Sequence, residues 1–137
     1  MDELIDAAFE LGQVLLKLEL SKRESAKLIR SLGGEQEEKV ILQKIGKYWN
    51  QQNFWDRPDG LVVVTNHRLA FLAKTDTLLT KTDFLSFPLE LIKDLEATRV
   101  MLISPAIRFQ VEGKTYVFTF LANAGQVVEA IEQATRR

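Results

Sequence analysis

Two apolar runs on either side of a short polar centre constrain the fold of this chain more than any other feature. The stretch is GLVVVTNHRLAFLAK, residues 60–74, and its polar centre is Thr65, Asn66, His67 and Arg68. Two such runs indicate two β-strands joined by a tight turn. Neither run alternates apolar and polar residues, as a strand with one solvated face does. We therefore predict a hairpin that is covered on both faces. The residues whose cover has to be found are Val62, Val64, Ala70 and Leu72.

The polar centre holds the only histidine of the chain, so it has to be weighed as an active site. A catalytic base needs a partner that orients it, and no nucleophile motif accompanies His67. Asn and His are enriched at positive φ, which both central residues of a primed hairpin turn adopt. We predict such a turn at Asn66 and His67 and assign no catalytic residue. Since glycine suits positive φ, we expect His67→Gly to leave the fold intact or slightly more stable.

The N-terminal segment, residues 2–32, has helical periodicity. Its apolar stripe, the candidate helical interface, is made of Leu4, Ala8, Leu11, Leu15 and Leu18. A second helix is predicted to begin at Ser21, because Ser21 and Glu24 form a capping box, and to end at Gly33. The stripe is shorter than a convincing coiled coil. Whether these helices cover the sheet of their own chain or join two subunits therefore stays open.

After residue 38 the hydrophobic period changes to two, and β-branched and aromatic residues predominate. The expected strands are residues 39–49, 61–65, 68–74, 83–87, 95–103, 106–112 and 115–121. We expect a tight turn at Glu112-Gly113-Lys114, and we expect Ser104-Pro105 to separate two strands. The last segment, NAGQVVEAIEQATRR, has one apolar face and is predicted to be a helix. This order predicts an α+β fold built on an antiparallel sandwich or partly open barrel.

Three segments carry a resemblance to a known family. They are GLVVVTNHRLAFL, SFPLELIKDLEATR and FQVEGKTYVFTFLANAGQVVEAI. In this order and spacing they resemble the bacterial pleckstrin-homology-like (PH-like) domains and the related GRAM domains, over about residues 37–135. The resemblance implies a bent antiparallel barrel of seven strands with a C-terminal capping helix, preceded here by an N-terminal helical hairpin. The expected organisation is a helical extension at 1–36 and a PH/GRAM-like domain at 37–137.

The resemblance implies a non-catalytic interaction module, because bacterial relatives are described as assembly modules. We expect self-association or docking to a protein partner, and a homo-oligomer. Lipid-binding members have a basic first hairpin, whereas Asp56 and Asp59 flank Arg57 in the corresponding segment here. Peripheral binding to membrane lipid headgroups through this loop, with weak contact to a membrane surface, is the alternative. Trp49 precedes the loop, and whether it packs inward stays open. The candidate contacts for a partner or headgroup are Lys47, Phe54, Trp55 and Arg57.

Composition argues against several classes of function. The 18 Lys and Arg residues are balanced by 19 Asp and Glu residues, and the signs are interspersed, which argues against nucleic-acid binding. Cysteine is absent and there is one histidine, so the sequence has no ligand spacing of the zinc type. Glycine-rich phosphate-binding loops are also missing. We expect no enzymatic activity, no cofactor, no bound metal and a cytoplasmic location, since no apolar run is long enough to span a membrane.

Overall fold

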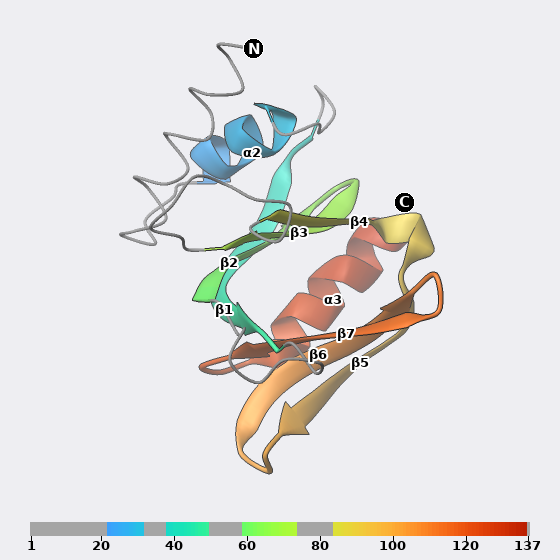
Figure 1. The fold of residues 1–137 in the computed structure, drawn as a ribbon. Helices are drawn as coiled ribbons and strands as arrows, with labels where there is room; N and C mark the ends of the chain where they lie inside the picture. The colour runs from blue at the N-terminus through green and yellow to red at the C-terminus, as the bar shows by residue number, and fades with distance from the viewer. Residues whose placement is uncertain (1–21, 32–37, 50–58, 74–83, 137) are drawn as a thin grey trace.

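The computed structural model describes residues 22–31, 38–49, 59–73 and 84–136 of the chain. Its elements are α2 (Lys22–Ser31), β1 (Val40–Tyr48), β2 (Asp59–Thr65), β3 (Arg68–Ala73), β4 (Phe84–Pro88), the 3-10 helix η1 (Leu89–Leu91), β5 (Lys93–Val100), β6 (Ser104–Val111), β7 (Lys114–Phe120) and α3 (Ala124–Thr135). The seven strands form one antiparallel sheet in the order β4-β3-β2-β1-β7-β6-β5. The sheet bends without closing, and α3 lies between its two halves (Figure 1). The predicted α+β fold with seven strands and a C-terminal helix is confirmed, while the first predicted helix lies outside the described residues.

Strand β1 joins the two halves of the sheet, because it pairs with β2 on one side and with β7 on the other. The two pairings overlap at Gly46 and Lys47, and Gly46 is opposite Gly60 of β2 and Phe120 of β7. A Cβ atom at Gly46 would lie 2.9 Å from the carbonyl oxygen of Thr119, and one at Gly60 would lie 2.4 Å from that of Leu72. Both distances are too short for a side chain, so the strands approach this closely only with glycine at both positions.

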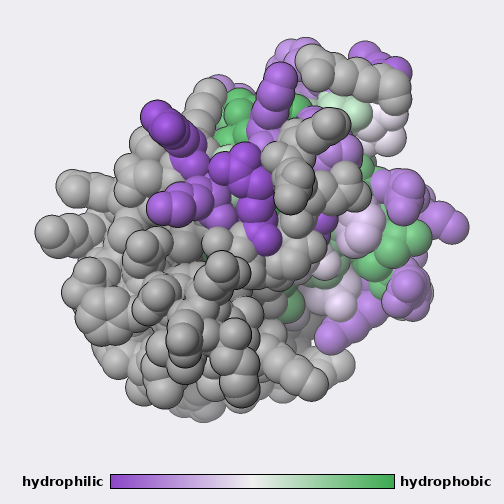
Figure 2. Space-filling model, turned by 90° about the horizontal axis from the view of Figure 1, so that it is seen from above, coloured by the Kyte–Doolittle hydropathy of each residue, from purple (hydrophilic) through white to green (hydrophobic). Residues whose placement is uncertain are grey.

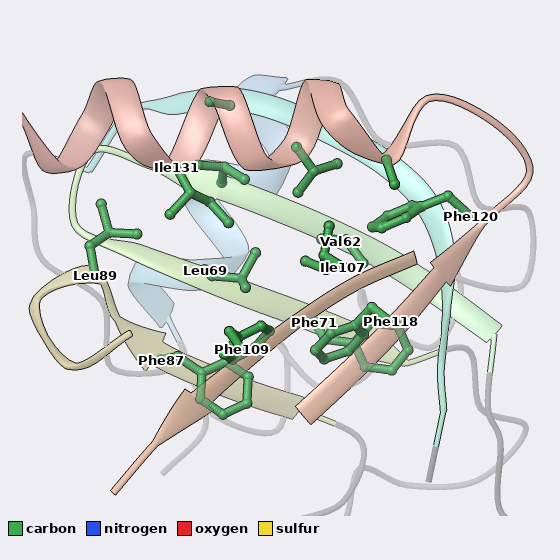
Figure 3. Close-up of a cluster of buried hydrophobic side chains, with 14 of the residues drawn as sticks. Val62, Leu69, Phe71, Phe87, Leu89, Ile107, Phe109, Phe118, Phe120 and Ile131 are labelled. Atoms are coloured by element: carbon green, nitrogen blue, oxygen red, sulfur yellow. The ribbon is translucent and has the colours of Figure 1, made fainter. Parts of the chain in front are cut away.

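The concave side of the sheet carries an aromatic core that α3 covers. The ring centroids of Phe71 and Phe118 are 5.1 Å apart, and those of Phe87 and Phe109 are 5.2 Å apart. At such separations aromatic pairs add stability beyond that of their buried area. Ile131 points from α3 toward these strands and is almost fully buried (Figure 3). The core therefore holds the helix against both halves of the bent sheet.

The register of β2 and β3 decides which apolar residues face which side. Val62 is opposite Phe71 and Val64 is opposite Leu69, and both pairs belong to the core under α3. The other face carries Leu61, Val63, Ala70 and Leu72, each of which is at most 4% exposed. Both faces are thus buried, as predicted. Val62 and Val64 nevertheless do not share a face with Ala70 and Leu72, with which they were grouped above. Directly paired residues point to the same side of a sheet, so the two valines lie with Phe71 and Leu69 under α3.

Helix α2 packs on the second face of the sheet, against β1. The hydroxyl of Ser25 donates a hydrogen bond of 2.6 Å to Oε1 of Gln43, which is opposite Val63 on that face. Ser25 and Ile29 are fully buried, so the contact excludes water. This part of the N-terminal extension therefore packs on the sheet of its own chain. The candidate helical interface, which is Leu4, Ala8, Leu11, Leu15 and Leu18, lies outside the described residues.

The polar centre of the apolar stretch forms a turn, but not one of the predicted type. Neither Asn66 nor His67 is among the residues with positive φ, so the primed turn is wrong. Instead Oγ1 of Thr65 accepts hydrogen bonds from the backbone N–H groups of His67 (3.1 Å) and Arg68 (3.0 Å). A side-chain hydroxyl that accepts these bonds stabilises the turn, so its central residues do not need positive φ. The expected benefit of His67→Gly therefore loses its physical reason.

Three hydrogen bonds tie this turn to two neighbouring segments. The N–H of Lys39 donates to Oδ1 of Asn66 (2.8 Å), and the N–H of Asn66 donates to the carbonyl oxygen of Lys39 (3.1 Å). The N–H of Leu89 donates to the carbonyl oxygen of His67 (3.0 Å). The turn therefore anchors the start of β1 and the start of η1, which is a structural role.

An ion pair lies beside the turn. Nε of Arg68 is 2.6 Å from Oε1 of Glu38, and Nη1 of Arg68 donates a hydrogen bond of 2.9 Å to Oγ of Ser86 in β4. The Glu38 side chain is fully buried and that of Arg68 is 16% exposed. A buried carboxylate requires such a partner, since an unpaired buried charge is strongly destabilising. The pair therefore links the segment before β1 to β3 and β4.

The close approach of β2 and β3 at Gly60 can be tested by adding one methyl group. Gly60→Ala should lower the free energy of unfolding by about 2 to 3 kcal/mol, because β3 has to move. The matched control is Gly125→Ala in α3, where no atom lies within 4 Å of the added Cβ. Alanine there should be neutral or stabilising by up to about 1 kcal/mol. Urea unfolding measures both, and equal effects would contradict the close approach.

The ion pair of Glu38 and Arg68 makes a second prediction about stability. Glu38→Gln keeps the shape of the side chain but leaves Arg68 without its counter-charge, so we expect a loss of about 3 kcal/mol. The control is Glu96→Gln, because Glu96 pairs with Arg108 at a site where both side chains are about half exposed. That substitution should change stability by less than about 1 kcal/mol. Thermal unfolding measures both variants. Similar shifts of the two unfolding midpoints would refute a structural role for the buried pair.

Candidate interaction surface

The candidate contacts predicted in the first hairpin are only partly described by the structure. Lys47 lies near the end of β1, where its Nζ is 3.5 Å from Oδ1 of Asp59, and both side chains are about half exposed. Phe54, Trp55 and Arg57 lie outside the described residues. The proposed contact set of this loop therefore stays a prediction, and Lys47 is the one member whose surroundings are known.

The two aromatic residues that precede this loop have different roles. Tyr48 points into the core, with its ring centroid 5.3 Å from that of Phe118. Trp49 is half-buried, and its backbone N–H donates a hydrogen bond of 2.8 Å to the carbonyl oxygen of Val117. Together with Val117 and Arg108, Trp49 lines a depression over β5, β6 and β7. It is Tyr48, therefore, that packs into the core from the end of β1.

The most exposed large apolar side chains of the described residues lie at one end of the β5–β7 half of the sheet. We call this set the apolar end: Met101, Leu102, Ile103 and Leu121, which are 71%, 88%, 80% and 92% exposed. The first three form the turn between β5 and β6, at the bottom of Figure 1. The register that pairs Ala106 with Thr119 brings Leu121, just after β7, to the same end of the sheet. Single exposed apolar residues are ordinary, but a group of four is typical of an interaction site.

The backbone of this turn adopts an unfavourable conformation. Met101 has φ of 52° and Leu102 has φ of 72°, which is the left-handed region. Residues with a Cβ atom lose about 1 to 2 kcal/mol each in that region. The predicted tight turn at Glu112 and Gly113 has φ of 52° and 81°, and there a glycine occupies the second position. The turn at Met101 and Leu102 therefore combines backbone strain with exposed apolar surface, and neither benefits the fold.

The segments that form the apolar end contain no carboxylate. Residues 97–111 have Arg99 and Arg108 as their only charged residues, and residues 113–128 have only Lys114. Arg108 is neutralised by its ion pair with Glu96. Arg99 is exposed on β5, two residues before the turn, and has no ion-pair partner within the described part of the chain. The apolar end is thus accompanied by one positive charge.

This surface was not predicted, because Met101, Leu102 and Ile103 belong to the strand expected at 95–103. That expectation is wrong, since β5 ends at Val100 and the three residues form the turn. Ser104 and Pro105 do not separate two strands but begin β6, where Pro105 is opposite Arg99. Apolar residues in a strand of period two and apolar residues at an exposed tip look alike in sequence. Only the register distinguishes them.

The described residues contain no arrangement that indicates metal chemistry. Across residues 22–31, 38–49, 59–73 and 84–136, no three His, Cys, Asp or Glu side chains are placed to hold a metal ion. In the same ranges, no helix has the length and apolar character that crossing a membrane requires. His67 lies in the turn described above, where its backbone N–H donates a hydrogen bond to Oγ1 of Thr65.

Comparisons with solved structures show what this fold is similar to. The C-terminal domain of an unknown protein from Leishmania infantum superposes with a TM-score of 0.62 at 17% identity, over 82% of this chain and 95% of that one. A DUF1696 family protein with a pleckstrin-homology domain from Shewanella loihica superposes with a TM-score of 0.54 at 15% identity, over 83% and 92%. A DH/PH fragment of PDZ-RhoGEF in complex with human RhoA gives 0.58 at 15%, over 98% of this chain but 40% of that one.

These likenesses establish the fold, and the family follows from the sequence. No curated protein matches the chain. Residues 35–135 match the bacterial PH domain family. The matched part comprises β1 to β7 and α3, which are the elements that form the bent sheet and its helix. Since the match spans most of the sequence, the chain belongs to the bacterial PH domain family.

Proposed function

We propose that the protein is a non-catalytic docking module of the cytoplasm that binds a protein partner or a second copy of itself through its apolar end. The observation that carries this proposal is the exposure of Met101, Leu102, Ile103 and Leu121 at one end of the sheet. A group of this kind is typical of a surface that is covered by a partner.

The unfavourable φ angles of Met101 and Leu102 support the same proposal. A strained, apolar, exposed turn lowers stability in the isolated chain, so a benefit elsewhere is needed to explain it. Burial of these side chains against a partner would supply that benefit, since each large aliphatic side chain gains about 1.5 to 3 kcal/mol on burial. The PDZ-RhoGEF fragment that binds RhoA supports the view that a chain with this fold can dock to a protein.

The second candidate function is peripheral attachment to anionic lipid headgroups. It is supported by the absence of carboxylates from residues 97–111 and by the presence of Arg99 beside the apolar turn. It also retains the earlier contact set of Lys47, Phe54, Trp55 and Arg57 in the first hairpin. Against it, Lys47 is already engaged with Asp59. We therefore place protein docking first and lipid attachment second.

Two double variants of the turn distinguish the effect of its backbone strain from the effect of its exposed apolar side chains. Met101→Asn combined with Leu102→Gly should raise the free energy of unfolding by about 1 to 2 kcal/mol, because asparagine and glycine both tolerate positive φ. The same change should weaken docking, which light scattering over a concentration series reports as lost self-association. The control is Met101→Ala with Leu102→Ala, which removes apolar surface without relieving the backbone. Docking should be lost there too, but without the gain in stability. A double variant that is more stable yet associates like wild type would overturn the proposal.

Sedimentation with vesicles distinguishes the two candidate functions. We expect the full chain to stay in the supernatant with vesicles of phosphatidylcholine and phosphatidylglycerol at physiological salt, where the Debye length is about 8 Å. Lipid attachment predicts the opposite result, namely pelleting that salt reverses. Vesicles of phosphatidylcholine alone are the control for nonspecific binding. Salt-sensitive pelleting that requires Leu102 would make lipid attachment the function of the apolar end.

A further inference from the structure

A small apolar pocket lies at the other end of the β5–β7 half, where α3 ends. We call it the η1–α3 pocket, and it is lined by Leu89, Ile92, Leu95, Ile131, Glu132, Thr135 and Arg136. Leu89 of η1 and Ile131 of α3 lie beside each other beneath the helix (Figure 3) and are buried. Ile92 and Leu95 are only half-buried, so the pocket opens to the surface between β5 and the helix. The base of the pocket is aliphatic, because its buried lining residues are Leu89 and Ile131.

The size of the pocket fits side chains of the kind found at the apolar end. Its volume is about 250 Å³. A leucine side chain has four carbon atoms, each similar in size to a water molecule, which takes about 30 Å³ of liquid volume. The pocket therefore has room for about two such side chains. The same chain thus carries an aliphatic pocket and an exposed aliphatic group of matching size.

The charges at the two sites are complementary. The rim of the pocket carries Glu132, which is about half exposed and only loosely paired, since its Oε2 lies 3.8 Å from Nη2 of Arg136. The apolar end is accompanied by Arg99 and by no carboxylate in its own segments. An arginine brought to this rim would meet Glu132 and compete with Arg136 for it, which helps to fix the orientation of a docked partner.

The apolar end cannot reach the η1–α3 pocket of its own chain. The β5–β6 turn lies at the bottom of Figure 1, whereas η1 and the C-terminal end of α3 lie at its upper right. Figure 2, viewed from above, shows hydrophobic surface among hydrophilic side chains on the right, the side on which that end of α3 lies. A group and a receptor at opposite ends of one chain favour contacts between successive copies.

We propose that the apolar end of one copy inserts into the η1–α3 pocket of a second copy, so that the chain associates head to tail. This inference rests on the proposed docking function and names its partner as a second copy of this chain. Leu102, the central residue of the turn, enters the pocket, and Arg99 lies over Glu132. Because the contact joins two different surfaces, each copy keeps one unused site. The assembly therefore grows with concentration or closes into a ring.

Two variants, each of which removes one of the two sites, test the proposal. Leu102→Asp places a carboxylate at the tip, and aspartate tolerates the positive φ of that position. Thr135→Trp fills the pocket from its exposed rim. Thr135→Ser is the matched control, because it keeps the hydroxyl that bonds to the carbonyl oxygen of Ile131. Both altered positions are exposed, so thermal unfolding should show each variant to be folded.

The expected result is specific to a head-to-tail contact. Sedimentation velocity should show concentration-dependent association for wild type and Thr135→Ser, and monomers for Leu102→Asp and Thr135→Trp alone. An equimolar mixture of the last two should form a heterodimer and nothing larger, since one supplies an intact pocket and the other an intact apolar end. Complementation of this kind cannot arise from a contact in which the same patch meets itself.

Three results would overturn the inference. The first is a wild-type chain that stays monomeric over the whole concentration series. The second is association of Thr135→Trp that equals wild type, and the third is a mixture of the two variants that stays monomeric. In each case the docking function is judged separately, by whether Leu102→Asp differs from wild type in association or vesicle binding. If it differs in neither, the proposed function fails together with the inference.

Discussion

The fold depends on how closely β1 approaches its two neighbours at Gly46. At this residue the strand is paired with Gly60 of β2 and with Phe120 of β7, so one short region holds both halves of the sheet. No side chain fits at Gly46 or Gly60, because the backbone of the adjacent strand occupies the space. The bend that results creates the concave side on which the aromatic residues and α3 pack.

The position of both interaction sites follows from this bend. Pairing of β1 with β7 directs the β5–β7 half away from β2 and β3, so the β5–β6 hairpin ends in solvent with Met101, Leu102 and Ile103 at its tip. The same half holds the C-terminal part of α3 against β5, and the pocket forms where the helix leaves the sheet. The two sites therefore lie at opposite ends of one unit of sheet and helix.

Much of the fold was predictable because local patterns determine it. Alternation over residues 106–112 and 115–121 predicts β6 and β7, and Glu112-Gly113 predicts the turn between them, since glycine readily adopts positive φ. The unalternating apolar runs around the polar centre correctly predict burial on both faces. The type of turn at Asn66 and His67 was not predictable, because the hydroxyl of Thr65 supplies an alternative to positive φ.

The interaction surface was not predictable from local pattern at all. Val100, Met101, Leu102 and Ile103 form one apolar run, and a strand is its ordinary interpretation. The strand ends earlier than the pattern indicates, because the chain turns at Met101 and Leu102, which both have positive φ. The pocket depends on the packing of η1 against α3, which are more than thirty residues apart in the sequence. Tertiary contacts, not periodicity, create both sites.

The central claim is that the apolar end is a docking surface whose receptor is the η1–α3 pocket of another copy. The most direct measurement is photo-crosslinking of the full chain with p-benzoylphenylalanine in place of Leu102, followed by mass spectrometry of the linked peptides. The account predicts links between chains to residues 89–95 and 131–136, and their loss in the presence of excess unlabelled wild type. A chain that stays uncrosslinked, or that links to residues elsewhere, would contradict it.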